Sequence, residues 1–174
     1  MFSYIIGITL GLLTPIFQYL FNIYYFNLGV YYYSQVHTSV WNCYIHTLFM
    51  PLTSLGFLVA IPSYFKLSNY NSFYLQKILF SYYIGLYLPI SSYVTLLYIL
   101  IYYPILLLSK KLYIKYKDNI NIFTYGLSLS IVSLFIQEYI GHYLGGDSPS
   151  RIEGVLNAIF YAKYYSIYHL QNLY

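Results

Sequence analysis

The chain has 174 residues, of which 60% are hydrophobic and only 7% are charged. A water-soluble domain usually carries about 25% charged residues, so this composition excludes an ordinary soluble domain and indicates a protein embedded in lipid. The net charge of +4 is too small to favour a nucleic-acid-binding protein. The single cysteine, Cys43, excludes an intrachain disulfide and a cysteine metal cluster.

Apolar segments long enough to cross a bilayer recur along the chain. The first, residues 1–21, is uncharged, and we expect a helix that is kinked or reset near Pro15. The second runs from about 41 to 65 and meets a polar stretch at 66–77. A run of 32 uncharged residues follows, at 78–109. As one helix that run would be about 48 Å long, whereas a hydrocarbon core is about 30 Å thick.

Pro89 predicts a break inside this long run. We therefore expect a tight hairpin of two short helices, and the alternative is one long kinked helix. The lysine-rich segment 109–119 is predicted to be a loop, as is the region that holds Lys66 and Lys77. Basic loops tend to stay on the cytosolic side of a membrane. The hairpin places both basic loops on one side, as this rule prefers.

Two further apolar segments complete the chain, at about 122–144 and 155–170, and a turn rich in Gly, Pro and Ser separates them. The sequence shows no internal repeat. Its 28 tyrosines are too many for two interfacial belts, so some must form hydrogen bonds inside the protein. We predict a single all-α domain over residues 1–174, a polytopic integral membrane helical bundle with about five to six membrane-embedded helices.

The predicted topology brings polar side chains from two distant segments to the membrane face opposite the basic loops. The second segment begins with His37, Asn42 and His46, and the fifth ends with Glu138 and His142. Asn42 and His46 are four residues apart, as are Glu138 and His142, so each pair shares one helix face. His37 precedes His46 by nine residues, which on one helix would place the two on nearly opposite sides. We therefore expect His37 in a loop or in a separate helix.

Imidazole and carboxylate groups suit Fe, Zn, Cu or Mn, and two histidines with one carboxylate suit a non-haem Fe(II) oxygenase. The alternative is that these histidines are hydrogen-bonded and metal-free, and that Glu138 pairs with a lysine. Ionisable groups within membrane segments are energetically expensive, which favours a functional role. His169 lies near the far end of the last segment, and we expect it to be structural.

Three stretches together resemble the 2-hydroxy-palmitic acid dioxygenase family, small membrane proteins of the endoplasmic reticulum. They are YYYSQVHTSVWNCYIHTLFMPL, LYLPISSYVTLLYILI and IQEYIGHYLGGDSPSRIEGVLNAIFYAKYY, and the resemblance covers about residues 31–165. It implies a multi-pass, Fe(2+)-dependent enzyme that uses O2 to shorten a 2-hydroxy fatty acid by one carbon, during phytosphingosine breakdown. By this resemblance His37, His46 and His142 are the candidate iron ligands, with Asn42 beside them.

The chain departs from the family's pattern around its Gly-His motif. The family usually has an acidic residue four positions after the histidine, where this chain has Gly146 followed by Asp147. It commonly has Gln four positions before the histidine, where this chain has Glu138. We therefore consider Glu138 or Asp147 as a further ligand or as a group that orients a histidine. Asn42 would donate a hydrogen bond to a ligand or to the substrate.

Two other classes of protein compete with an enzyme. A non-catalytic membrane scaffold of the same fold, with a degenerate metal site, would carry packed and metal-free histidines. A small transporter or channel would carry polar residues through the full depth of the membrane. In this chain the polar residues gather at one predicted end instead.

Overall fold

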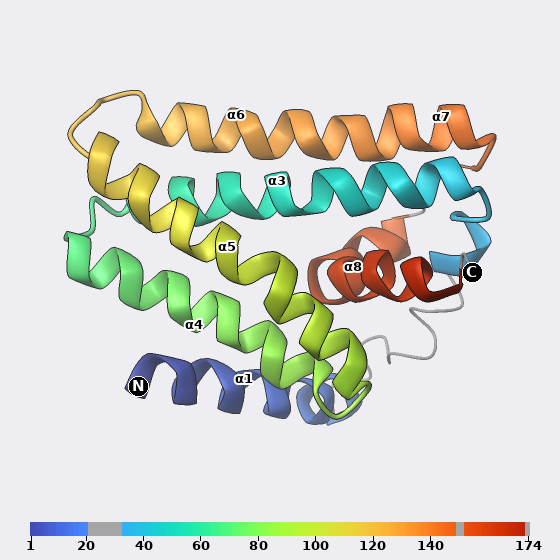
Figure 1. Ribbon diagram of the computed structural model, residues 1–174, viewed down its shortest axis with the longest axis horizontal. Coiled ribbons are helices and arrows are strands. Elements are labelled where there is room, and N and C mark those ends of the chain that lie inside the picture. Colours follow the sequence, from blue (N-terminus) through green and yellow to red (C-terminus); the bar gives the residue numbers. More distant parts are fainter. Residues whose placement is uncertain (21–32, 149–151, 173–174) are drawn as a thin grey trace.

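The structure is a computed structural model that describes residues 1–20, 33–148 and 152–172, without the side chains of 152–157 and 169–172. Its described residues form a bundle of helices and contain no strand (Figure 1). The helices are α1 (Phe2–Leu20), α3 (Val40–Tyr64), α4 (Asn69–Tyr87), α5 (Ser92–Tyr116), α6 (Ile122–Phe135), the π-helix η1 (Ile136–Gly141), α7 (His142–Gly145) and α8 (Ile152–Asn172).

Four helical stretches of the described chain are long and apolar enough to cross a membrane. They are α1, α3, α5 and the continuous helix Ile122–Gly145, which α6, η1 and α7 form together. Their outward faces carry large apolar side chains, such as Ile16, Leu48, Leu100 and Ile131, each more than half exposed. So much exposed apolar surface is unfavourable in water. The fold is therefore an all-α membrane bundle, as its composition predicted.

The helices form two pairs with one helix lying across both. α3 and α6 run antiparallel and side by side, α1 packs against α4, and α5 crosses from one pair to the other (Figure 1). α8 packs against α3 and α5. Because α3 and the α6–α7 stretch run in opposite directions, the start of α3 lies beside α7.

Small residues allow the paired helices to approach closely. A Cβ atom added at Gly11 of α1 would lie 2.0 Å from the carbonyl oxygen of Tyr82 in α4. A Cβ atom at Gly56 of α3 would lie 2.3 Å from Oγ of Ser130 in α6. Glycine at these positions brings backbone against backbone, which is how helices commonly associate in membranes.

Buried tyrosines form much of the core, and their hydroxyl groups are paired with backbone oxygens. The Tyr87 hydroxyl donates to the carbonyl oxygen of Phe160 at 2.9 Å, and the Tyr98 hydroxyl donates to that of Phe80 at 3.2 Å. Each bond ties α4 to another helix, α8 in the first case and α5 in the second. This confirms that some tyrosines form hydrogen bonds inside the bundle.

The long uncharged run is divided at Pro89 into a hairpin, as predicted, but its two helices are longer than the short ones expected, with 19 residues in α4 and 25 in α5. α4 ends at Tyr87 and α5 begins at Ser92, with Pro89 in the turn between them, and the two helices pack together. The alternative of one long kinked helix is therefore wrong. α1 continues through Pro15 to Leu20, so the helix is not reset there.

The two basic segments are largely helical, so their prediction as loops is wrong. α4 already begins at Asn69, where the Ser68 side chain accepts a hydrogen bond from the Asn71 amide at 3.2 Å, and α5 continues to Tyr116. Lysine is a good helix former, so a basic segment can extend a helix beyond the lipid. The turns that remain, after α3 and after α5, both lie at the same end of the bundle (Figure 1, left).

Candidate metal centre

Three histidines meet at the end of the bundle opposite those two turns. His37, His46 and His142 each place one ring nitrogen within 4.8 Å of the others. Their ring centroids lie 4.4 Å apart for His37 and His46, 4.9 Å for His37 and His142, and 5.7 Å for His46 and His142. All three side chains are almost completely buried. The cluster joins segments 96 residues apart, as the predicted topology required.

His37 lies in the non-helical stretch before α3, which is one of the two placements that its spacing allowed. Its Nδ1 atom is 2.9 Å from the carbonyl oxygen of Tyr33, and its Nε2 atom is 3.1 Å from Nε2 of His46. The Tyr33 ring stacks on the His37 ring, with centroids 3.6 Å apart. Burial raises the pKa of the Tyr33 hydroxyl well above its usual value, so this group stays neutral.

His142 presents a ring nitrogen suited to a metal ion. Its Nδ1 atom lies 2.8 Å from the carbonyl oxygen of Ser148. An Nδ1–H group that donates to a carbonyl leaves the lone pair on Nε2, which is the usual state of a metal-binding histidine. The Nε2 atom of His142 is buried and has no hydrogen-bond partner among the described residues. Its nearest charged neighbour is Oε2 of Glu138, at 3.7 Å. The site therefore fits a metal ion.

The helix that carries His142 departs from regular α geometry just before it. η1 is a short π-helix, a form that occurs mostly as single turns and often at functional sites. A Cβ atom at Gly141, the last residue of η1, would lie 2.8 Å from Oδ1 of Asn42, and one at Gly145 of α7 would lie 3.0 Å from Cβ of Asn42. These two glycines let the helix approach the start of α3 closely enough for His142 to reach the other histidines.

Asp147 ties the two segments of the cluster together. Gly146, with a φ of 67°, ends α7 in the left-handed conformation that favours glycine. The Asp147 carboxylate then accepts hydrogen bonds from the Thr38 amide (3.2 Å), the Ser39 amide (3.2 Å), the Asn42 side chain (2.8 Å) and the Thr38 hydroxyl. The residue after His37 is thereby attached to the turn after His142.

The protonation state of Asp147 follows from these contacts. Partial burial raises the pKa of its carboxyl group, but the hydrogen bonds from Thr38, Asn42 and Ser39 outweigh burial and hold the pKa below its usual value. The carboxylate is therefore ionised at neutral pH. Its amide group also donates to the carbonyl oxygen of His142 at 3.0 Å, so both ends of the residue hold the loop in place.

The other predicted site residues surround the histidines without joining the group of three. Asn42 donates to Asp147 and, at 3.1 Å, to the carbonyl oxygen of Val36, so it stabilises the loop that carries His37. Glu138 stands beside His142 with 39% of its side chain exposed. Any role of Asn42, Glu138 or Asp147 toward a metal or a substrate stays a prediction. The His169 side chain lies outside the described residues.

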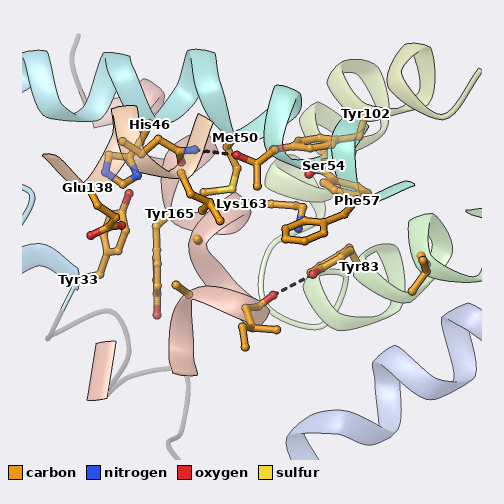
Figure 2. Close-up of a pocket in the computed structure, with 18 of the residues that line it drawn as sticks. Tyr33, His46, Met50, Ser54, Phe57, Tyr83, Tyr102, Glu138, Lys163 and Tyr165 are labelled. Atoms are coloured by element: carbon orange, nitrogen blue, oxygen red, sulfur yellow. Dashed lines mark hydrogen bonds between the residues drawn. The ribbon is translucent and has the colours of Figure 1, made fainter. Parts of the chain in front are cut away.

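A long apolar cavity of about 620 Å³ begins at the cluster. His37, His46 and Glu138 line one end, and the cavity follows α3 as far as Ile61, about 22 Å further by helix rise. Figure 2 shows His46, Glu138 and Tyr33 together on one side of it, and Tyr83 and Tyr102 on the other. Its apolar lining includes Met50, Phe57, Leu58, Phe80, Tyr98 and Tyr102.

Two polar side chains in this cavity were not predicted from the sequence as site residues. Lys163 of α8 lies over the Tyr83 ring, with its Nζ atom 3.8 Å from the centroid. Gln137 of η1 is fully buried between α6 and α3. The sequence pattern that could have indicated Gln137 is a polar amide within an apolar segment, next to Glu138. The cavity itself depends on how side chains from α3, α4, α5, α8 and the α6–η1 stretch pack, and no local sequence pattern predicts it.

Fold and site together define a polytopic helical membrane protein with a buried three-histidine cluster that could hold a metal ion. In comparisons with known proteins, the chain matches no protein-family model, no curated protein and no solved structure. The resemblance to the 2-hydroxy-palmitic acid dioxygenases, which depends on short motifs, therefore stays a prediction.

Proposed function

We propose that the protein is an Fe(2+)-dependent dioxygenase of the endoplasmic reticulum membrane that shortens 2-hydroxy fatty acids by one carbon. The observation that carries this proposal is the buried three-histidine cluster at one end of a long apolar cavity. A metal site alone would fit many functions, and an apolar cavity alone would fit any lipid binder. Their continuity favours metal-dependent chemistry on the polar end of a fatty acid.

His37, His46 and His142 would hold the ion. Imidazole ligands suit iron, and also zinc and copper, so the choice of iron depends on the motif resemblance. Bound iron would supply the activation of O2. Asp147 and Asn42 would keep the His37 loop attached to the His142 turn. Glu138, partly exposed beside His142, would orient that ring, act as a fourth ligand or exchange protons with water.

The substrate's chain would lie in the cavity along α3, with the 2-hydroxy-carboxylate end at the histidines. The apolar walls would exclude water from the chain and hold the polar end in one orientation. The reaction is balanced without an added reductant: R–CH(OH)–COOH + O2 gives R–COOH + CO2 + H2O. The substrate loses four electrons and O2 gains four, and the carboxyl carbon leaves as carbon dioxide.

The direct test uses purified protein in lipid nanodiscs with Fe(2+), O2 and 2-hydroxyhexadecanoic acid. We expect pentadecanoic acid, identified by mass spectrometry, with one O2 consumed for each molecule formed. His142→Ala should abolish product, whereas Tyr143→Ala, at an exposed position next to it, should not. Full activity in His142→Ala would overturn the assignment of this residue.

A non-catalytic scaffold is the competing proposal, and one observation favours it. The 3.1 Å contact between His37 and His46 is a satisfactory hydrogen bond without a metal ion. Metal analysis of the purified protein separates the two proposals. An enzyme should contain about one iron ion per chain after reconstitution with Fe(2+), and the scaffold should contain none.

A further inference from the structure

The amide group of Gln137 is only half paired. Gln137 is fully buried and lines the cavity. Its Nε2 atom donates to Oγ1 of Thr53 at 2.9 Å and to the carbonyl oxygen of Ser133 at 3.0 Å. Its Oε1 atom has no hydrogen-bond partner among the described residues. A buried and unpaired acceptor destabilises a protein, so a partner that arrives with a ligand would explain why this one is present.

The neighbouring groups determine which way the amide faces. The Thr53 hydroxyl already donates to the carbonyl oxygen of Phe49 at 3.1 Å, so it can only accept from Gln137. The Ser133 group is a carbonyl, which also only accepts. Both neighbours therefore require the amide nitrogen. The oxygen is left without a partner among the described residues, so a ligand that pairs with it would bring an O–H or N–H donor.

This acceptor stands at the histidine end of the cavity. Gln137 lines the cavity together with His46, and the next residue, Glu138, lies 3.7 Å from His142. The cavity wall beyond is mostly apolar. A matching ligand is therefore a long hydrocarbon chain with a donor group near the end that faces the histidines. A 2-hydroxy acyl chain has this form, whereas an unsubstituted fatty acid at neutral pH has no donor.

We propose that Oε1 of Gln137 accepts a hydrogen bond from the hydroxyl group of the bound lipid and so selects hydroxylated over unsubstituted acyl chains. The ligand class rests on the proposed function, but selection by one amide oxygen is a separate claim. Gln137 would be a residue that determines specificity. A site built to pair with a substrate hydroxyl discriminates strongly against the analogue that lacks it.

The test measures the binding of three acids to the wild-type protein in nanodiscs: hexadecanoic, 2-hydroxyhexadecanoic and 2-methoxyhexadecanoic acid. The methoxy acid keeps the oxygen but has no donor. We expect the hydroxy acid to bind roughly 10- to 100-fold more tightly than either of the others. The measurement is made with metal-loaded protein and after chelation, because the preference in the chelated protein cannot come from metal ligation.

Gln137→Met removes the acceptor at similar volume, and the preference for the hydroxy acid should fall to about one. A control variant should keep it: Ser54→Ala removes another buried hydroxyl from the same cavity and leaves the Gln137 amide and both of its partners in place. An unchanged preference in Gln137→Met would overturn the proposal.

The ligand series on the wild-type protein decides the question even if Gln137→Met does not fold. Equal affinity for the hydroxy and methoxy acids in the chelated protein would overturn the role of Gln137. If the shortened acid is produced without this preference, only the role of Gln137 fails. If the preference is present but no shortened acid is produced, only the dioxygenase activity fails.

Discussion

The helix pair of α3 with Ile122–Gly145 is built differently at its two ends. In the half nearer the lysine-containing turns, Gly56 packs directly against Ser130 and both helices keep regular α geometry. At the histidine end the same pair holds a π-helix, a left-handed glycine at 146 and a carboxylate attached to the start of α3. One end is joined by close backbone packing, and the other by a network of polar contacts.

The difference shows that the helix pair departs from regular α geometry at the histidine end, where polar contacts replace close backbone packing. Close packing of small residues already holds the pair together in a membrane. The irregular end adds buried polar groups, which are unfavourable in lipid unless they are paired or used. Departures from regular geometry and buried polar groups both concentrate at functional sites. The histidine end is therefore where changes should affect metal binding, and the other end is where they should affect stability alone.

The largest expected effect comes from removing a ligand at the histidine end. His46→Ala should weaken metal binding by more than about 100-fold, since even outer-shell groups contribute about 10- to 100-fold. Competition with a chelator, followed by the absorption spectrum of bound Co(2+), measures this. Tyr143→Ala, also at that end but exposed, is the control. Unchanged affinity in His46→Ala would show that the cluster is not a metal site.

Asp147→Ala should have the next largest effect. It leaves the Thr38 and Ser39 amides without their acceptor, so we expect a loss of about 1–3 kcal/mol in stability and about 10- to 100-fold in metal affinity. Asp118→Ala, in the exposed turn at the other end of the bundle, is the matched control. If both variants behaved alike, Asp147 would not position the histidines.

A pair of glycine substitutions compares the two ends directly. Gly141→Ala brings a Cβ atom within 2.8 Å of Asn42, and Gly56→Ala brings one within 2.3 Å of Ser130. Each should lower stability by about 1–3 kcal/mol through overpacking, measured by thermal unfolding in detergent. Only Gly141→Ala should also lower metal affinity, because only Gly141 adjoins His142. An equal loss of affinity in Gly56→Ala would remove the distinction between the ends.

The smallest effect is expected from Glu138→Gln. The carboxylate is partly exposed and lies 3.7 Å from His142, so water screens much of its interaction. Metal affinity, measured by the same chelator competition, should fall by less than about tenfold. A loss of 100-fold would instead identify Glu138 as a ligand.

The convergence of the histidines could be predicted because it depends on counting membrane crossings. Pro89 divided the long uncharged run, which placed the start of the second segment and the end of the fifth on one face. The prediction of basic loops was wrong because charge shows where a helix leaves the lipid, not where it ends. Lys110 and Lys115 lie on α5, beyond its most apolar part.

Sequence alone determined that this protein is embedded in lipid, that it is helical, and at which end of the bundle its histidines lie. These features depend on hydropathy and helix periodicity, which are local properties of the chain. Tertiary structure alone decided the π-turn before His142, the partners of Asp147, the unpaired oxygen of Gln137 and the apolar cavity. Each of these depends on which atoms of different helices come within a few ångströms, and side chains far apart in sequence determine that.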